Sequence, residues 1–454
     1  MPVSRIEFNE VIELKSSLDD ENGNPSKRKT QCSHTDVTMR IAKSLLVEPG
    51  KNFWYGTLAV GLSVFVFAYS TNFGFLSILV FYGLWLPLVL VDYRKVIGNY
   101  ARFYWVLPFV LLACMSFSWS AAPPVTLRAG IQYLTTIICA LIASRIIDAR
   151  TFASGVSMGV ALVLLYSLGF GQYQYDALDG SYSFVGAFAS KNQLGFFASL
   201  GVYFAFASFF VLQTSKIWRC IAVVCGILSA YCLVASSSAT SVIATLAIFT
   251  ATLIVGVVLK FSPKHRRSFF VVGVAVALVL VAVAINAGAI DLVLGAFGKN
   301  STLTGRTYLW QEGFRASREA PLMGIGYQAY WVQGFSEAER LWAEFYIPAR
   351  TGFHFHNTYI EVLVELGYVG VVLISLLLGG VVIGFLRRLL TEGYTPQGHL
   401  MFGIALLLLI RSFFEIDFIQ PYTIGSFLLY YSAGLLAIPQ RTPFKMMQPT
   451  QLQT

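Results

Sequence analysis

The sequence predicts an all-α polytopic membrane protein. Of its 454 residues, 56% are hydrophobic and only 12% are charged, whereas soluble globular chains carry about 25% charged residues. The mean hydropathy is +0.67. The apolar residues gather in about twelve stretches, each near the roughly 20 residues that a helix needs to cross a bilayer. Because lipid offers no partner to backbone polar groups, we expect these stretches to be helices.

The predicted elements follow one another from a polar tail onward. Residues 1–51 are charged and short of aromatic side chains, which predicts a disordered cytosolic tail, and no apolar core of a signal peptide precedes residue 53. Nine predicted spans occupy residues 52–289, a polar segment covers 290–356, three spans occupy 357–440, and a tail covers 441–454. The spans are expected at 53–69, 73–91, 104–120, 127–146, 152–170, 193–213, 218–235, 241–260, 268–289, 358–386, 399–416 and 422–438.

The basic residues indicate how the spans are oriented. Every second loop between them carries lysine or arginine, and such loops face the cytoplasm. With twelve spans, both termini are then expected in the cytoplasm, and the polar segment 290–356 faces outward, toward the periplasm or the extracellular side. The residues that set this pattern are Arg94, Lys95, Arg102, Arg145, Arg150, Lys216, Arg219, Lys264, Arg266, Arg267, Arg387, Arg388, Arg441 and Lys445.

Two classes of function are disfavoured by composition. The formal charge of +9 comes mostly from short loops that set topology, so we expect no nucleic-acid partner. The six cysteines show no paired CxxC spacing, and five of them lie in apolar runs. Cysteines in such runs behave as small hydrophobes, so we expect no disulfide and no cysteine-based metal site.

The polar segment 290–356 combines charge with aromatic side chains. The patterns around 310–315 and 337–345 predict two short amphipathic helices. The aromatic residues have two open interpretations, an interfacial belt or a surface on which sugar rings stack. They are Trp310, Tyr327, Tyr330, Trp331, Trp342, Phe345 and Tyr346.

The segment ends at His356-Asn357, where the tenth predicted span begins. A histidine at the outer rim can accept a proton from a hydroxyl group. The alternative is that Asn357 caps the helix and His356 merely precedes it. Glu361 and Glu365 follow on one face of this helix, too deep in the membrane to lack partners.

Cations gather near the same rim. Arg411 lies inside the eleventh predicted span, which makes it a functional candidate, although an i, i+4 ion pair with Glu415 is a purely structural alternative. Arg128, Lys191 and Arg306 are also expected at the outer face. These four cations suit a diphosphate, which arginine binds through paired hydrogen bonds, although Arg128 and Lys191 can also simply reach the interface.

These residues carry a resemblance to a known family. The chain resembles the O-antigen ligase and Wzy-type polysaccharide polymerase superfamily of bacterial membrane glycosyltransferases. It resembles most closely the exopolysaccharide polymerases of the succinoglycan type. The stretches that match are His356-Asn357 with Gly367-Tyr368-Val369-Gly370, the run from Gly186 to Gly195 that holds Lys191-Asn192, Gly305-Arg306 with Trp310, and Pro321-Leu322-Met323-Gly324-Ile325-Gly326. One departure is Ala239, where the family often has a basic residue.

The resemblance implies a GT-C-like fold and an inverting transfer. The donor and the acceptor would be oligosaccharide repeat units on undecaprenyl diphosphate. Chain-length regulators and export proteins are further partners that it suggests.

We assign roles to the residues on this basis. His356 would act as general base or orient the acceptor, Arg306 would stabilise the leaving group, and Arg411, Arg128 and Lys191 would bind the diphosphate. Asn357, Glu361, Glu415 and Asn192 support them. Fixed arginines would replace a divalent ion, so no metal or cofactor is expected. The alternatives are an O-antigen ligase that transfers glycan to a lipid core, and a lipid-linked glycan flippase or exporter.

Overall fold

The computed structural model describes residues 42–176, 181–212, 214–288, 295 and 305–438. The C-terminal tail and most of the N-terminal tail lie outside the described residues. Residues 42–51 at the end of the predicted N-terminal tail contain a short helix, α1 (Ser44–Val47), that packs against α3 (Leu88–Val96).

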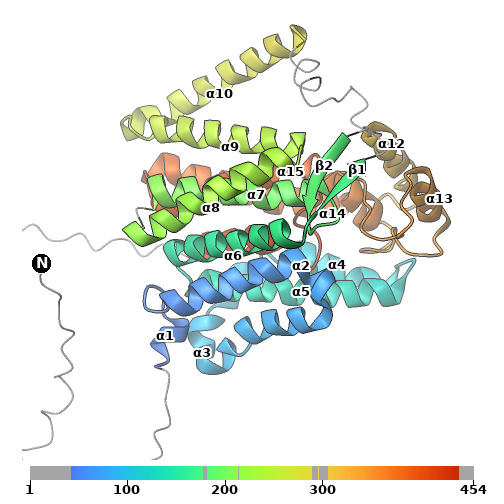
Figure 1. The fold of residues 1–454 in the computed structure, drawn as a ribbon, viewed down its shortest axis with the longest axis horizontal. Coiled ribbons are helices and arrows are strands. Elements are labelled where there is room, and N and C mark those ends of the chain that lie inside the picture. The colour runs from blue at the N-terminus through green and yellow to red at the C-terminus, as the bar shows by residue number, and fades with distance from the viewer. Residues whose placement is uncertain (1–41, 177–180, 213, 289–294, 296–304, 439–454) are drawn as a thin grey trace, which may run out of the picture. The chain divides into compact units, whose positions relative to one another are not determined.

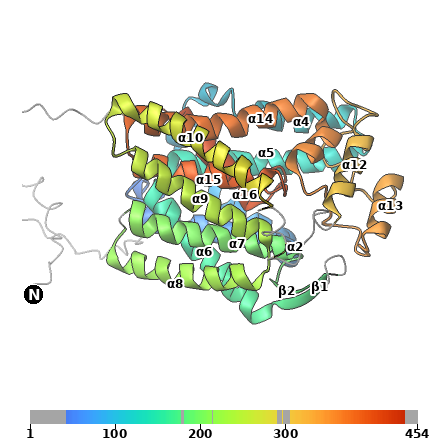
Figure 2. The ribbon, with the colours of Figure 1, turned by 90° about the horizontal axis from the view of Figure 1, so that it is seen from above.

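Helices make up most of the described residues (Figures 1 and 2). In addition to α1 and α3 they are α2 (Phe53–Trp85), α4 (Pro108–Met115), α5 (Pro123–Ile146), α6 (Ala149–Phe170), α7 (Lys191–Phe206), α8 (Lys216–Ala235), α9 (Ala239–Val258), α10 (Pro263–Asn286), α12 (Arg306–Ala316), α13 (Ser336–Glu344), α14 (Thr358–Glu392), α15 (Pro396–Ser412) and α16 (Ile424–Ala437).

Among the described residues, 8 helices are long and apolar enough to cross a membrane. This supports a polytopic membrane protein, and the number of twelve spans stays a prediction. The first predicted span lies within α2, which continues through a break at Gly74, where φ is +62°. The third and the last two predicted spans correspond to the shorter helices α4, α15 and α16.

The expectation of an all-α chain is wrong at one place. Strands β1 (Gln172–Asp176) and β2 (Ser181–Gly186) form an antiparallel hairpin between α6 and α7. Both views place this hairpin at the same end of the helix bundle as α12 and α13. The hairpin, α12 and α13 are therefore the non-spanning elements that surround the candidate site.

Small residues allow the spans to pack closely. Helix α2 packs along α6, and a Cβ on Gly159 would lie 2.6 Å from the carbonyl oxygen of Gly61. Such positions let two backbones approach where lipid gives helices little hydrophobic reason to associate. Helices α7 and α8, α5 and α16, and α14 and α15 form further close pairs.

A turn from the polar segment is inserted into the backbone of α14. This helix breaks at Gly367, whose φ is +65°. The amides of Ile325 and Gly326 donate to the carbonyls of residues 364 and 365, while those of residues 368 and 369 donate to the carbonyls of 321 and 322. The Pro321–Gly326 stretch thus replaces the intrahelical hydrogen bonds lost at the break, a recognised cause of helix kinks.

The polar segment also has a core of its own. Leu309 of α12 and Leu341 of α13 pack with Phe355 and the first turns of α14. Tyr330 and Trp342 are buried in this cluster and Tyr327 is buried in the main core. Most of the aromatic side chains that could have stacked on sugar are therefore structural. Tyr346 is an exception, with 75% of its surface exposed.

Candidate active site

The carboxylate of Glu415 contacts side chains from three other segments of the chain. Its Oε1 accepts hydrogen bonds from Arg306 Nη2 at 2.9 Å and from Asn192 Nδ2 at 2.8 Å. Its Oε2 lies 3.4 Å from Nδ1 of His356 and 3.9 Å from Nε2 of His354. The structure therefore brings together four predicted site residues, Asn192, Arg306, His356 and Glu415, and adds His354, to which the sequence assigned no role.

Each member of this cluster lies at the end of a helix. Arg306 is the first residue of α12, and Asn192 lies in the first turn of α7, which Ser190 caps. His356 precedes Asn357, which caps α14 by accepting from the amides of residues 359 and 360. The capping role predicted for Asn357 is confirmed, and its Nδ2 also donates to the carbonyl of residue 413. Glu415 follows α15 by three residues, and its carbonyl accepts from the Thr358 hydroxyl at 2.6 Å.

The backbone at His356 is strained. Its φ is +51°, a left-handed value that costs a non-glycine residue of this type on the order of 1–2 kcal/mol. Neighbouring bonds hold the strained residue in place. The amide of Phe355 donates to Glu361 Oε2 at 2.8 Å, and its carbonyl accepts from Trp310 Nε1 at 2.9 Å. Glu361 therefore holds the backbone next to His356, and its supporting role in the site stays a prediction.

The surroundings of Glu415 favour its charged form. Burial alone would raise the pKa of this carboxyl group, but the interactions with His356 and Arg306 are stronger together and hold the pKa well below its usual range. The carboxylate is therefore a fixed negative charge between an arginine and two imidazoles. Such a charge orients both neighbours and stabilises positive charge on either of them.

His354 is neutral in this environment. Burial, followed by the interaction with His356, lowers its pKa to about 3. Its Nδ1 accepts a hydrogen bond from the His356 amide at 3.0 Å, so the proton of the neutral ring is on Nε2. That N–H points toward Oε2 of Glu415. The tautomer of His354 is thus fixed by the backbone of His356.

The cluster contains ligand types that a divalent metal uses. Potential ligand atoms of His354, His356 and Glu415 lie within 4.8 Å of one another. The fit is poor for two reasons. The Nε2 of His354 carries a proton in this arrangement and has no lone pair for a metal. The second reason is that Glu415 already contacts the guanidinium of Arg306, which would repel a cation at this position.

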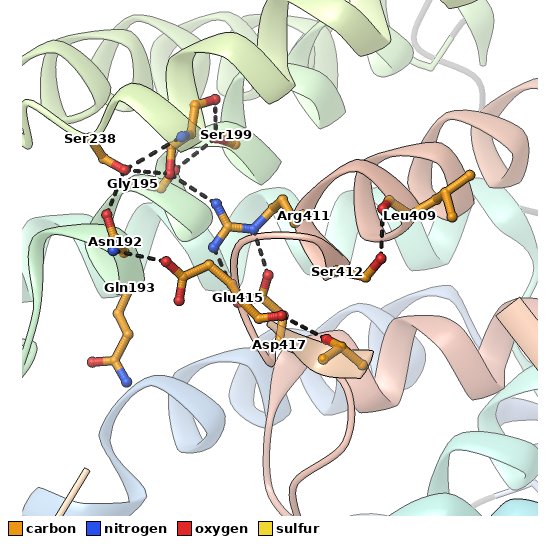
Figure 3. Close-up of polar contacts among 12 residues, drawn as sticks. Asn192, Gln193, Gly195, Ser199, Ser238, Leu409, Arg411, Ser412, Glu415 and Asp417 are labelled. Atoms are coloured by element: carbon orange, nitrogen blue, oxygen red, sulfur yellow. Dashed lines mark hydrogen bonds and ion pairs between the residues drawn. The ribbon is translucent and has the colours of Figure 1, made fainter. Parts of the chain in front are cut away.

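Arg411 has a different partner from the one expected (Figure 3). The predicted i, i+4 pair with Glu415 is wrong. Arg411 donates instead to both carboxylate oxygens of Asp417, at 2.5 and 3.1 Å, and to Ser241 Oγ at 2.9 Å. Its guanidinium also lies over the Phe196 ring, and the residue is fully buried. Helix α15 ends at Ser412, so Glu415 is not on its face and the helical spacing does not apply.

A chain of polar contacts joins the Arg411 pair to Glu415. Ser241 Oγ lies 3.0 Å from Ser238 Oγ, and Ser238 Oγ donates to Asn192 Oδ1 at 2.9 Å. Asn192 in turn donates to Glu415 (Figure 3). The Arg411 guanidinium thus lies close to Ala239, the position where the resembled family often carries a basic residue. Asp417, Ser238 and Ser241 were missed by the sequence analysis, because only their folded positions link them to the site.

The remaining predicted cations are placed less directly. Lys191 begins α7 beside Asn192 and is half-buried at the edge of the cluster. Arg128 is an exposed residue of α5. Among the described residues it forms no hydrogen bond or ion pair with Glu415. Its role in binding a diphosphate stays a prediction.

Comparison with known proteins decides the family. The O-antigen ligase family matches residues 224–375. The chain is also 57% identical over 403 residues to the exopolysaccharide production protein ExoQ of Rhizobium meliloti (strain 1021), which covers 89% of this chain and 93% of that protein. The chain belongs to the O-antigen ligase family. The part matched by the family, residues 224–375, contains Arg306 and His356, whereas Asn192 and Glu415 lie outside it.

Proposed function

We propose that the protein polymerises oligosaccharide repeat units linked to undecaprenyl diphosphate into exopolysaccharide, by metal-independent inverting glycosyl transfer at the periplasmic face of the inner membrane. The observation that carries this proposal is that Arg306 and His356 contact opposite oxygens of Glu415. The proposed cation for the leaving group and the proposed base for the hydroxyl therefore contact the same carboxylate. The relative named for exopolysaccharide production supports the choice of product.

In the proposed reaction, a hydroxyl oxygen of the acceptor sugar attacks the anomeric carbon of the donor. A new glycosidic C–O bond forms from the face opposite the diphosphate, and the bond between the anomeric carbon and the diphosphate oxygen breaks. The hydroxyl proton passes to His356, and undecaprenyl diphosphate leaves with the bonding electron pair. A base positioned in this way contributes typically 10²–10⁴-fold to the rate.

Glu415 determines which nitrogen of His356 acts as base. The carboxylate faces Nδ1 and favours the tautomer with its proton there, which leaves the lone pair on Nε2 for the acceptor hydroxyl. The same negative charge stabilises the imidazolium that forms when the proton is transferred. The distance of 3.4 Å shortens when substrate binds, as is common for catalytic contacts in unliganded enzymes.

The diphosphate is proposed to bind Arg306 and Lys191. Arg306 has five N–H donors, and one of them engages Glu415, so the guanidinium can hold a phosphate while it remains oriented by the carboxylate. Lys191 adds charge from the start of α7, and Arg128 is kept as a further candidate. Arg411 is assigned a positioning role, because its donors contact Asp417 and Ser241 inside the protein.

Reconstitution of the purified protein in liposomes with lipid-linked repeat units tests the proposal. Polymer length is measured on gels with Mg²⁺ or with EDTA. Elongation in EDTA is expected, and a strict need for Mg²⁺ would contradict the role given to the arginines. A parallel reaction with the His356→Asn variant controls for contaminating activity.

A ligase is the second candidate, because the matching family is that of the O-antigen ligases. Cells that lack the protein separate the two functions. Loss of a polymerase leaves single repeat units on the lipid carrier, whereas loss of a ligase leaves long polymer that is not attached to its acceptor.

A further inference from the structure

The hairpin between α6 and α7 has one face made of aromatic side chains. In its register Tyr173 pairs with Phe184 and Tyr175 pairs with Tyr182. Cross-strand partners share a face, and so do residues two apart on one strand. All four rings therefore lie on the same face, while Gln174 and Ser183 lie on the other.

One ring of this aromatic face is buried and the other three are exposed. Phe184 is buried, but Tyr173, Tyr175 and Tyr182 are 53%, 60% and 69% exposed. The rings of Tyr173 and Tyr182 stack with centroids 5.6 Å apart and planes only 8° from parallel. The three exposed tyrosines give this face an aromatic surface, and exposed aromatic surface is suited to binding an apolar face of a ligand.

The hairpin is coupled to the candidate active site through its second strand. Strand β2 packs against α7 and ends at Gly186, five residues before Lys191. The next residue, Asn192, donates to Glu415. Both views place the hairpin at the end of the bundle where α12 begins with Arg306 (Figures 1 and 2). A strand of five or six residues extends about 15–20 Å, so the tyrosines lie within a few sugar units of the site.

The charge of the hairpin distinguishes between two candidate partners of the aromatic face, a sugar chain and a membrane surface. Segments that dock on anionic lipid carry lysine or arginine beside their aromatic residues. Residues 172–176 and 181–186 contain neither, and they include Asp176. An acidic hairpin with tyrosine rings is poorly suited to an anionic bilayer. It suits the apolar C–H face of a pyranose ring, whose hydroxyl groups can meet the phenol groups of the tyrosines.

Most aromatic side chains of the polar segment are packed in its core and do not provide a surface for sugar rings. Tyr330 and Trp342 are buried in the core of that segment. Tyr346 is an exposed exception. The three hairpin tyrosines are all exposed and lie together on one face.

We propose that the face formed by Tyr173, Tyr175 and Tyr182 is a glycan-binding subsite, which stacks pyranose rings of a lipid-linked repeat unit while its terminal sugar reaches the site at Glu415. This inference rests on the proposed function for the identity of the glycan. It adds a contact several sugars away from the reacting atoms, and such a contact lowers the cost of positioning the reacting sugar.

Binding measurements on a catalytically silent protein test the subsite. The full-length His356→Asn variant in detergent micelles is titrated with the repeat-unit oligosaccharide cleaved from its lipid carrier. Replacement of Tyr173 and Tyr182 together by alanine is expected to raise Kd roughly ten-fold, about 1.4 kcal/mol. Replacement of both by phenylalanine keeps the rings and should change Kd by less than about three-fold, on the scale of one lost hydrogen bond. Gln174→Ala on the opposite face is the matched control, with an unchanged Kd.

Three outcomes would overturn the subsite. The first is an unchanged Kd in the double alanine variant. The second is an equal loss in the alanine and phenylalanine pairs. The third is an unchanged Kd together with a hairpin that is protected from protease only in liposomes, which would assign the face to the membrane surface. Tyr175→Ala is a single change at an exposed position and provides a second reading if the double variant is unstable.

The two proposals fail separately. If reconstituted wild-type protein does not elongate repeat units but Kd still depends on the tyrosines, the subsite stands and the polymerase assignment falls. If elongation proceeds and Kd is unchanged in the tyrosine variants, only the subsite proposal is wrong.

Discussion

His356 and Glu415 face each other across 3.4 Å, between Nδ1 of the ring and Oε2 of the carboxylate. The histidine has a left-handed backbone, and the glutamate is in the turn after α15. The opposite oxygen of the same carboxylate contacts Arg306. The two groups that we propose accept a proton and stabilise a leaving anion are therefore positioned by one negative charge.

Loss of the imidazole at residue 356 should remove most activity without unfolding the protein. Asparagine tolerates φ of +51° better than alanine, so His356→Asn is the variant of choice. Polymer formation in reconstituted liposomes should fall about 10²–10⁴-fold, with an unfolding temperature close to that of the wild type. His354→Asn is the control, because its side-chain oxygen can still accept from the amide of residue 356. Activity near wild type in His356→Asn would exclude the ring as base.

The geometry of the cation at residue 306 should matter as well as its charge. Arg306→Lys keeps the positive charge but loses the planar pair of donors. We expect elongation to slow by about ten-fold or more, in line with the loss of a directed donor at a developing anion. Arg315 lies on the same helix. Among the described residues its side chain pairs only with Glu312, and it is 71% exposed. The Arg315→Lys variant should therefore elongate repeat units at nearly the wild-type rate. Equal activity of Arg306→Lys and wild type would mean that charge alone suffices.

Arg411 and Asp417 should behave as a structural pair. Arg411→Met removes the buried partner of the partly buried Asp417, and breaking such pairs costs about 3–5 kcal/mol. The unfolding temperature should drop clearly, and Arg411→Met combined with Asp417→Leu should recover part of it. The double variant is expected to keep polymer formation within about ten-fold of wild type. A double variant that folds normally but makes no polymer would instead make Arg411 a ligand of the diphosphate.

The break in α14 should not tolerate a side chain. A Cβ on Gly367 would lie 2.2 Å from the carbonyl carbon of Leu322, and the residue has a φ of +65°. Gly367→Ala should therefore reduce the amount of folded protein in membranes, measured by size-exclusion chromatography of detergent extracts. Gly379 lies further along the same helix, with no neighbouring atom within 4 Å of an added Cβ. Normal yield of Gly367→Ala alongside Gly379→Ala would show that the inserted turn is not needed for assembly.

Stability should decrease between pH 6.5 and 4.5 because of His354. Its pKa is lowered to about 3 in the folded protein, so the unfolded chain takes up a proton at a higher pH than the folded one. The resulting stability is present above pH 6.5 and is lost as the pH falls, by up to about 2 kcal/mol at pH 5. The carboxyl of Glu415 has a lowered pKa, so its own contribution is lost only below about pH 4.5.

A comparison of unfolding temperatures at pH 7.5 and pH 5 isolates this effect. Wild type should lose more on acidification than His354→Asn, which has no ring to protonate. The neighbours of the ring, His356, Arg306 and Glu415, are common to both proteins. Parallel losses in the two proteins would refute the account.

The sequence was informative where one physical pattern dominates. Apolar length placed α5, α6 and α8 within a few residues of their observed bounds, and the capping preference of asparagine placed the start of α14. The amphipathic patterns predicted α12 and α13. These features depend on neighbouring residues, which a single sequence displays.

Features that depend on distant contacts were harder to predict. The partner of Arg411 was wrong because the helix ends before Glu415, and a turn then presents Asp417 instead. The hairpin alternates tyrosine with polar residues, a strand pattern, but its low hydropathy made it look like a simple loop. The loop aromatics have a composition that also fits an exposed surface, and only folding decided that Tyr330 and Trp342 are buried.

Glu415 follows Asn192 by 223 residues and comes late in the chain. During synthesis, Arg306 and His356 are made long before the carboxylate that positions them, so a nascent chain carries both groups without their common anchor. Insertion of α15 completes the arrangement. An incompletely made copy therefore lacks the charge that orients both groups until α15 and the turn after it are in place.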